Sequence, residues 1–237
     1  MKSNNLVVKS LLILGLSITS IVANEMNDGA NEATIAKITI SQNMNKKESL
    51  AILDKILSPF EDMTEYALAN DFSGMKNGYK NIENIEDNAL LKQTIPSAKL
   101  KILSQNIEKL KTYIDNAAYS NAALLSSNMF NDSVTNFKYK NSIQDQLHIE
   151  HLDYMGFRLL ALLSVKDVNY AQISKVITNA KINWNAIREK IKDENSVDAF
   201  NLLFKGLEQS VKTENNTMIK ILAELDLALV DVIERKI

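Results

Sequence analysis

The hydrophobic residues of this chain recur at spacings of three and four from about residue 47 to the C-terminus. Three stripes show the pattern most clearly: Leu53, Ile56, Leu57, Phe60 and Met63; Ile173, Ile177, Ala180, Trp184, Ile187 and Ile191; and Met218, Leu222, Leu225, Leu229 and Ile233. A period near 3.6 residues is typical of amphipathic helices that bury one side. The sequence has only 6 glycines and 2 prolines, too few for the turns of a sheet of short strands. The pattern predicts an all-α protein.

Capping residues predict where these helices begin and end. Ser58-Pro59-Phe60-Glu61 has the arrangement of a capping box with proline at the first helical position, which predicts a kink or a restart there. We expect Asp71 to cap a helix that runs to about Lys92. We expect a long helix to begin at Pro96 and to extend at most to Phe137. The other predicted N-caps are Ser142, Asp167, Ser196 and Thr213. Short connections between such helices predict an antiparallel bundle of six to eight helices in one domain, residues 47–237.

A short segment recurs at two of the predicted turns. Residues 164–169 and 210–215 lie 46 residues apart and are identical at four of six positions. Asp71 lies in a similar setting, 96 residues before Asp167. One interpretation is a weak helical-hairpin repeat that stacks into a binding surface. The other, which we favour, is that hairpins of similar length need similar caps.

The N-terminus has the features of a secretory signal peptide. Lys2 and Lys9 supply positive charge, and the apolar stretch Leu11–Val22 has 12 residues, whereas a transmembrane helix needs about 20. Ala23 provides a small residue for cleavage, so we predict a signal peptide over residues 1–23; the alternative is a retained anchor. The polar residues 24–46 are expected to form a flexible lead-in. The mature chain is then expected to have no membrane span.

Composition narrows the compartment and the partners. The chain has no cysteine, so disulfides, thiolate metal sites and covalent c-type haem are excluded. Its formal net charge of −2 gives no reason to expect binding to nucleic acid or to an anionic membrane. A chain of this size can form a stable core without disulfides, so the lack of cysteine is compatible with export. We predict a periplasmic location, with full secretion as the alternative.

Both histidines of the protein lie in one short segment that also carries two acids. On a helix that turns about 100° per residue, His148, His151 and Met155 project into one apolar arc. Glu150 and Asp153 fall on the other side. Imidazole nitrogens and a thioether suit copper, or haem iron if a second helix supplies the opposite ligand. The alternative, which we favour, is that both histidines are core or interface residues with ordinary hydrogen-bond partners.

Catalytic motifs are absent from the sequence. It has no Gly-x-Ser-x-Gly elbow, no glycine-rich phosphate loop and no His-Glu-x-x-His zinc helix. The acidic pairs Glu61/Asp62 and Asp193/Glu194 are explained by helix starts or turns. The sequence therefore predicts a protein that is not an enzyme.

Two further features have both a structural and a functional interpretation. Trp184, the sole tryptophan, continues an apolar stripe, so we expect core packing rather than ligand stacking. The stretch Leu225–Asp231 is apolar on most sides, which fits a central bundle helix or a helix that faces a partner.

The sequence as a whole favours an exported, non-enzymatic helical bundle that binds a partner protein or a small ligand. One alternative is a metal- or haem-binding bundle that uses His148, His151 and Met155. The other is a periplasmic scaffold or chaperone-like protein, which would need an exposed apolar groove.

Overall fold

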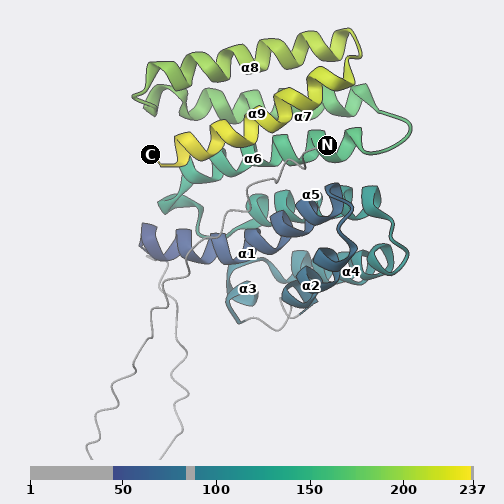
Figure 1. Ribbon diagram of the computed structural model, residues 1–237. Helices are drawn as coiled ribbons and strands as arrows, with labels where there is room; N and C mark the ends of the chain where they lie inside the picture. The colour runs from purple at the N-terminus through teal and green to yellow at the C-terminus, as the bar shows by residue number, and fades with distance from the viewer. Residues whose placement is uncertain (1–44, 84–88, 236–237) are drawn as a thin grey trace, which may run out of the picture. The chain divides into compact units, whose positions relative to one another are not determined.

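The computed structural model describes residues 45–83 and 89–235, and these residues are almost entirely helical (Figure 1). The predicted signal peptide, and the predicted lead-in up to residue 44, lie outside the described residues. The α-helices are α1 (Lys46–Leu68), α2 (Phe72–Glu83), α3 (Ala89–Thr94), α4 (Ser97–Asp115), α5 (Tyr119–Asn136), α6 (Gln144–Leu163), α7 (Tyr170–Ile187), α8 (Glu194–Lys212) and α9 (Asn216–Glu234). All but α3 have at least 12 residues, and the described residues contain no strand. The prediction of an all-α protein is confirmed.

The helices pack as two sets of four. In the first bundle (α1, α2, α4 and α5) and in the second bundle (α6 to α9), each helix contacts the next, and the first helix packs most extensively against the fourth. Each bundle has its own apolar core. Helix α6 joins the two, because it also packs against α5 and α1, and its residues contribute to both cores. No helix in the described part of the chain is both long and apolar enough to span a bilayer.

The two bundles repeat the same arrangement along the chain. Each helix of the second bundle begins 97 or 98 residues after its counterpart in the first. Buried positions coincide at these offsets: Met75 with Ile173, Ile107 with Phe204, Ala122 with Ile219, Ser126 with Ala223, and Met129 with Asp226. The repeating unit is therefore four helices long, about twice the 46-residue hairpin spacing of the sequence.

The helix starts follow asparagine and aspartate more closely than the sequence suggested. Asn45 makes a complete capping box with Glu48, and Asp71 caps α2 by accepting a hydrogen bond from the Gly74 amide at 2.8 Å. The cap predicted at Ser58 is wrong: α1 continues through Pro59, and the Ser58 hydroxyl donates to the carbonyl of Asp54 at 3.0 Å. The residues that precede α6, α7, α8 and α9 are Ile143, Asn169, Asp193 and Asn215, in place of the predicted Ser142, Asp167, Ser196 and Thr213.

Three of the hairpin turns share one backbone conformation. Asn70, Ala117 and Glu214 follow α1, α4 and α8 with φ of 55°, 49° and 50°. In each turn the next amide donates to the carbonyl five residues earlier at 2.8 Å, which closes the helix end. The turn at Ala117 ends α4 at Asp115, so the extension of that helix to Phe137 is wrong. Glycine is the usual residue in this backbone conformation. None of these three turns has a glycine there, so the sequence does not mark them.

Residues 164–169 connect α6 to α7, and residues 210–215 span the end of α8 and the turn before α9. Both segments therefore lie at turns, as expected, and the two turns touch. Asn169 and Asn215 both cap the following helix by accepting the amide of the third residue on, each at 3.0 Å. The hydroxyl of Tyr170 donates to the carbonyl of Glu214 at 3.2 Å and lies 2.8 Å from Oδ1 of Asn216. The shared sequence thus serves the same capping role at one end of the second bundle.

Gly156 allows α6 and α9 to approach closely. A Cβ atom there would lie 2.6 Å from Cδ2 of Leu227 and 3.1 Å from the backbone oxygen of Ala223. We expect Gly156→Ala to lower the free energy of unfolding by about 1–2 kcal/mol, because overpacking outweighs the higher helix propensity of alanine. Urea unfolding measures this loss. Gly206→Ala is the control, since its Cβ would meet only the flexible Leu222 side chain; an equal loss in both variants would contradict the expectation.

Candidate functional sites

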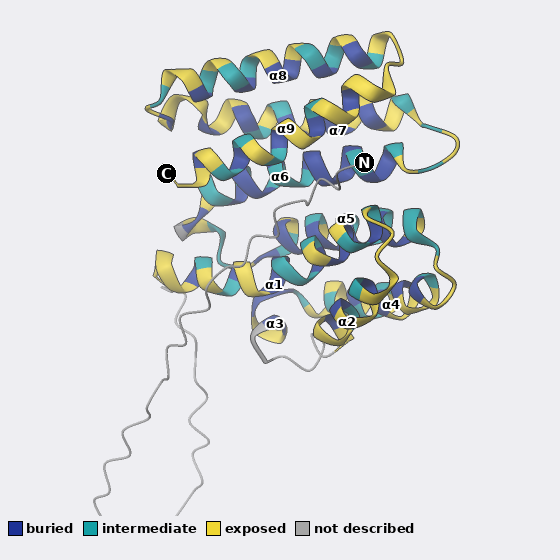
Figure 2. Ribbon diagram, viewed as in Figure 1, coloured by how far each residue is buried: buried dark blue, intermediate teal, exposed yellow. Residues whose placement is uncertain are grey.

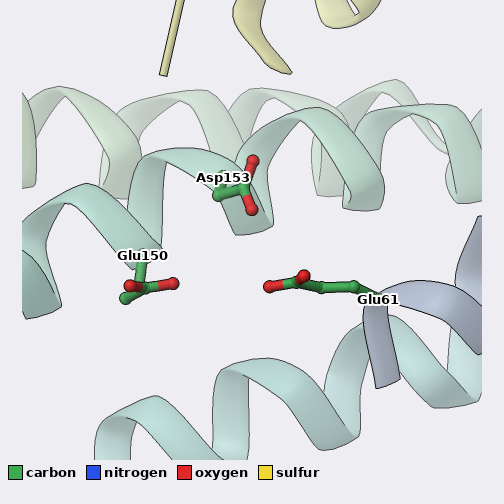
Figure 3. A group of neighbouring side chains, drawn as sticks. All are labelled: Glu61, Glu150 and Asp153. Carbon is green, nitrogen blue, oxygen red and sulfur yellow. The ribbon is translucent and has the colours of Figure 1, made fainter. Parts of the chain in front are cut away.

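Three carboxylates meet where the first bundle contacts the second. Glu61 comes from α1, and Glu150 and Asp153 come from α6 (Figure 3). Glu150 and Asp153 are three residues apart, so they point to the same side of the helix. One carboxylate oxygen from each residue lies within 4.8 Å of the other two. This acidic cluster is the one group of three or more His, Cys, Asp or Glu side chains that the described residues bring together in this way.

The charged groups that act on Glu61 and Glu150 among the described residues are acidic. Glu150 is only 8% exposed, and Gln146 donates from Nε2 to the Oε1 atoms of Glu150 and Glu234, each at 2.8 Å. The carboxylate of Glu61 accepts no hydrogen bond from the described residues. The charges that act on Glu61 are all carboxylates, from Asp153, Glu150, Glu234 and Asp54. The cluster is therefore acidic, with Glu150 buried and with Glu61 and Asp153 partly buried.

Burial and mutual repulsion both favour the protonated forms. Burial raises the pKa of Glu150 to about 8, and the neighbouring Glu234 and Asp54 add to the rise against the hydrogen bond from Gln146. Burial also raises the pKa of Glu61 well above its ordinary value, and Asp153 and Glu150 add to that rise. Because both pKa values are raised, ionising Glu61 and Glu150 together is unfavourable. Chemically, the cluster can share protons or coordinate a hard cation through oxygen.

The side chains of the two histidines on α6 contact different helices: His148 contacts α7 and His151 contacts α5. Nδ1 of His148 lies 2.8 Å from Oδ1 of Asn183 on α7. Nε2 of His148 lies 3.2 Å from the side-chain nitrogen Nε2 of Gln144. Nδ1 of His151 lies 3.2 Å from Oδ1 of Asn131 on α5. In the tautomer that satisfies both contacts, both ring nitrogens of His148 have partners, which favours the structural interpretation.

Of the other members of the predicted metal site, Met155 is fully buried and His151 is partly buried. Met155 is 0% exposed in the core of the second bundle. Burial, then the charges of His148 and Lys140, lowers the pKa of His151 to about 4, so its ring is neutral at pH 7. Copper or haem binding by His148, His151 and Met155 stays a prediction.

The acidic cluster was missed in the sequence because its members lie far apart along the chain. Glu61 was attributed to a helix start, but it lies in the interior of α1. Glu150 and Asp153 were assigned to the side away from the histidines, which is where they lie, yet that side faces α1 rather than solvent. Their spacing of three residues was the one available clue.

Helix α9 is apolar on two sides. Its buried side carries Ile219, Ala223, Asp226, Val230 and Ile233. Its outer side carries the α9 stripe, namely Met218, Ile221, Leu225, Ala228 and Val232, all exposed. Figure 2 shows exposed positions recurring along α9. Met218 and Leu225 were expected in a core-facing stripe, but they are 42% and 44% exposed, so that prediction is wrong for them. Leu202 of the neighbouring helix α8 is also exposed, at 66%.

The buried side of α9 contains an acid without a partner. Asp226 is 0% exposed, and neither of its carboxylate oxygens has a hydrogen-bond partner. Burial raises the pKa of Asp226 well above its ordinary value, partly offset by the backbone of Gly156, which lies outside hydrogen-bonding geometry. This helix therefore buries a carboxyl group while it exposes a row of hydrophobic side chains.

The chain matches no protein-family model, no curated protein and no solved structure. The fold and contacts define an all-α protein of two equivalent four-helix bundles, with an acidic cluster at their contact and an exposed apolar stripe on the last helix.

Proposed function

We propose that this is an exported, non-enzymatic binding protein that docks an amphipathic, basic helix of a partner protein onto α9. The observation that carries the proposal is the spacing of the α9 stripe. Its five residues follow one another at intervals of three, four, three and four. This is the a/d spacing of a heptad repeat, the pattern along which one helix packs against another. The features of the N-terminus support export to the periplasm.

The exposed area supports a binding role for this side of the helix. Met218, Ile221, Leu225 and Val232 are between 38% and 51% exposed. Half of the large exposed hydrophobic side chains of the described residues thus lie on one side of one helix. Scattered exposed hydrophobic residues need no explanation, whereas a contiguous row marks an interaction surface.

Charge next to the stripe favours a basic partner over a second copy of the chain. In the heptad frame of the stripe, Glu224 and Asp231 occupy the g positions on one flank, and Leu222 and Leu229 occupy the e positions on the other. Lys220 pairs with Glu224 at 3.9 Å, but both are exposed and such pairs are weak. Antiparallel pairing of two α9 helices would place acidic g positions against each other, which is repulsive. A helix with lysine or arginine along that edge would be attracted instead.

The proposal is tested with two synthetic heptad peptides that share leucine and isoleucine at a and d and carry either lysine or glutamate at e and g. We expect the lysine peptide to bind the mature protein at least about tenfold more tightly than the glutamate peptide, which corresponds to about 1.4 kcal/mol. Ile221→Lys/Leu225→Lys should abolish binding and change stability by less than about 0.5 kcal/mol, since both positions are exposed. Fluorescence anisotropy of labelled peptide gives both affinities.

A control and two contrary outcomes make this test specific. Ile182→Lys alters a side chain of α7 that is 65% exposed and outside the stripe, so it should leave binding unchanged. Equal affinity for both peptides would contradict the charge argument and support a chaperone-like surface. A wild-type dimer in sedimentation equilibrium that becomes monomeric in the Ile221→Lys/Leu225→Lys variant would identify a second copy as the occupant and overturn the proposal.

A further inference from the structure

Helix α5 holds the place in the first bundle that α9 holds in the second. Each is the fourth helix of its bundle, and α9 begins 97 residues after α5. At this offset, buried side chains of α5 coincide with buried side chains of α9: Ala122 with Ile219, Ser126 with Ala223, Met129 with Asp226, and Ser133 with Val230. The two helices therefore turn equivalent sides toward their own core, so their outer sides correspond position by position.

The outer side of α5 is covered by α6, the first helix of the next bundle. Nη1 of Arg158 donates to the carbonyl of Leu124 at 2.8 Å and to the hydroxyl of Ser127 at 3.3 Å. Nδ1 of His151 lies 3.2 Å from Oδ1 of Asn131. Residues later in α5 thus meet residues earlier in α6, which means that the two helices pack antiparallel. Leu124 also packs against both apolar cores.

The corresponding side of α9 is open. At the offset of 97 residues, the three α5 positions that contact α6 correspond to Ile221, Glu224 and Ala228. The α5 positions are buried or half-buried, whereas all three α9 positions are exposed. Ile221 and Ala228 belong to the α9 stripe. The stripe therefore includes positions through which the equivalent helix of the first bundle binds a following helix.

One of these positions differs in charge, and the difference favours a basic occupant. Arg158 of α6 donates to Ser127, and the counterpart of Ser127 on α9 is Glu224. The arginine meets neutral oxygen atoms on α5, whereas a cation in the same place on α9 would meet a carboxylate. A hydrogen bond between two charged groups is stronger than one with a neutral acceptor. The contact of Glu224 with Lys220 at 3.9 Å is exposed and therefore weak.

We propose that the partner helix lies antiparallel to α9, in the place that α6 takes on α5, with a basic side chain opposite Glu224. This inference rests on the proposed docking of a basic helix on α9, and it adds the direction of that helix and the carboxylate that its charge meets. The C-terminal end of the partner helix then lies near Thr217, and its N-terminal end lies near Arg235.

Cysteine crosslinking measures the direction, because the chain has no cysteine of its own. Thr217→Cys and Arg235→Cys each place one cysteine at an exposed position near one end of α9. The two positions are about 27 Å apart at the helical rise of 1.5 Å per residue. The lysine heptad peptide carries one cysteine at its C-terminus, and a short bis-maleimide joins the two thiols.

We expect this peptide to give at least about tenfold more crosslinked product with Thr217→Cys than with Arg235→Cys, because only the nearer thiol lies within reach of the linker. The preference should reverse when the peptide cysteine is moved to the N-terminus.

Glu224→Gln tests the charged contact. We expect this variant to bind the lysine peptide about twofold to fivefold more weakly, the range for an exposed charge pair. Glu108→Gln removes the same charge from an exposed position of α4, so its affinity should equal that of wild type. An unchanged affinity in Glu224→Gln would overturn the proposal.

The outcomes separate this inference from the proposed function. A peptide that binds but crosslinks equally to both cysteines, or better in the parallel arrangement, overturns the antiparallel placement and leaves docking on α9 intact. A lysine peptide that shows no affinity in fluorescence anisotropy overturns both.

Discussion

Asp226→Asn is expected to raise the free energy of unfolding at pH 8 by at least about 1.4 kcal/mol, the energy of one pKa unit, because the variant removes a carboxyl group whose pKa burial raises well above its ordinary value. Asp226 is 0% exposed and neither carboxylate oxygen has a hydrogen bond. Because its folded pKa is raised, wild type has its full stability below the ordinary aspartate pKa of 3.8 and loses stability as the pH rises toward the folded value. The variant cannot ionise, so its advantage should nearly vanish at pH 4.

Urea unfolding at pH 4 and pH 8 provides the comparison. Asp167→Asn, in the exposed turn between α6 and α7, is the control and should leave stability unchanged at both values. The equivalent position of the first bundle carries Met129, also buried, which shows that the arrangement accommodates a side chain without charge there. Equal stability of wild type and Asp226→Asn at pH 8 would refute this explanation.

Trp184→Ala is expected to lower the free energy of unfolding by about 3–5 kcal/mol, the usual loss for removal of a buried tryptophan. Trp184 is 2% exposed, and its ring stacks on Phe200 with centroids 4.5 Å apart. Its Nε1 donates to Oδ1 of Asn201 at 3.1 Å. The expectation that this residue packs in the core is confirmed by its burial.

Chemical denaturation followed by circular dichroism measures the effect of Trp184→Ala. Trp184→Phe keeps the stacking but not the hydrogen bond, so its loss should be clearly smaller. A loss below about 1 kcal/mol for the alanine variant would mean that this ring does not support the second core.

The helices could be predicted from the sequence because their information is local. The spacing of Leu53, Ile56, Phe60 and Met63 matches their burial in α1, and Pro96 immediately precedes α4. The caps were harder, since several asparagine, aspartate, serine and threonine residues lie within three positions of each helix start. Asn215 caps α9 rather than Thr213 because the turn at Glu214 adds a residue that sequence does not mark.

The sites could not be predicted, because they depend on how helices far apart along the chain pack together. Glu61 and Glu150 meet only because α1 and α6 come into contact. On α9, periodicity alone favoured an apolar stripe through Met218 and Leu225 as the core side. The second bundle instead buries the side with Asp226, which leaves Met218 and Leu225 exposed. When a helix is apolar on two sides, periodicity alone does not show which side faces the core.

The most direct test of helix docking on α9 is site-specific photo-crosslinking with the lysine heptad peptide. A photoreactive residue is placed at Leu225 in the stripe or, as the matched exposed position, at Ile182 on α7. We expect a crosslink to the peptide from position 225 and none from position 182, with the product lost when unlabelled peptide competes. A crosslink from position 182, or none from position 225 at saturating peptide, would contradict the assignment of α9 as the docking surface.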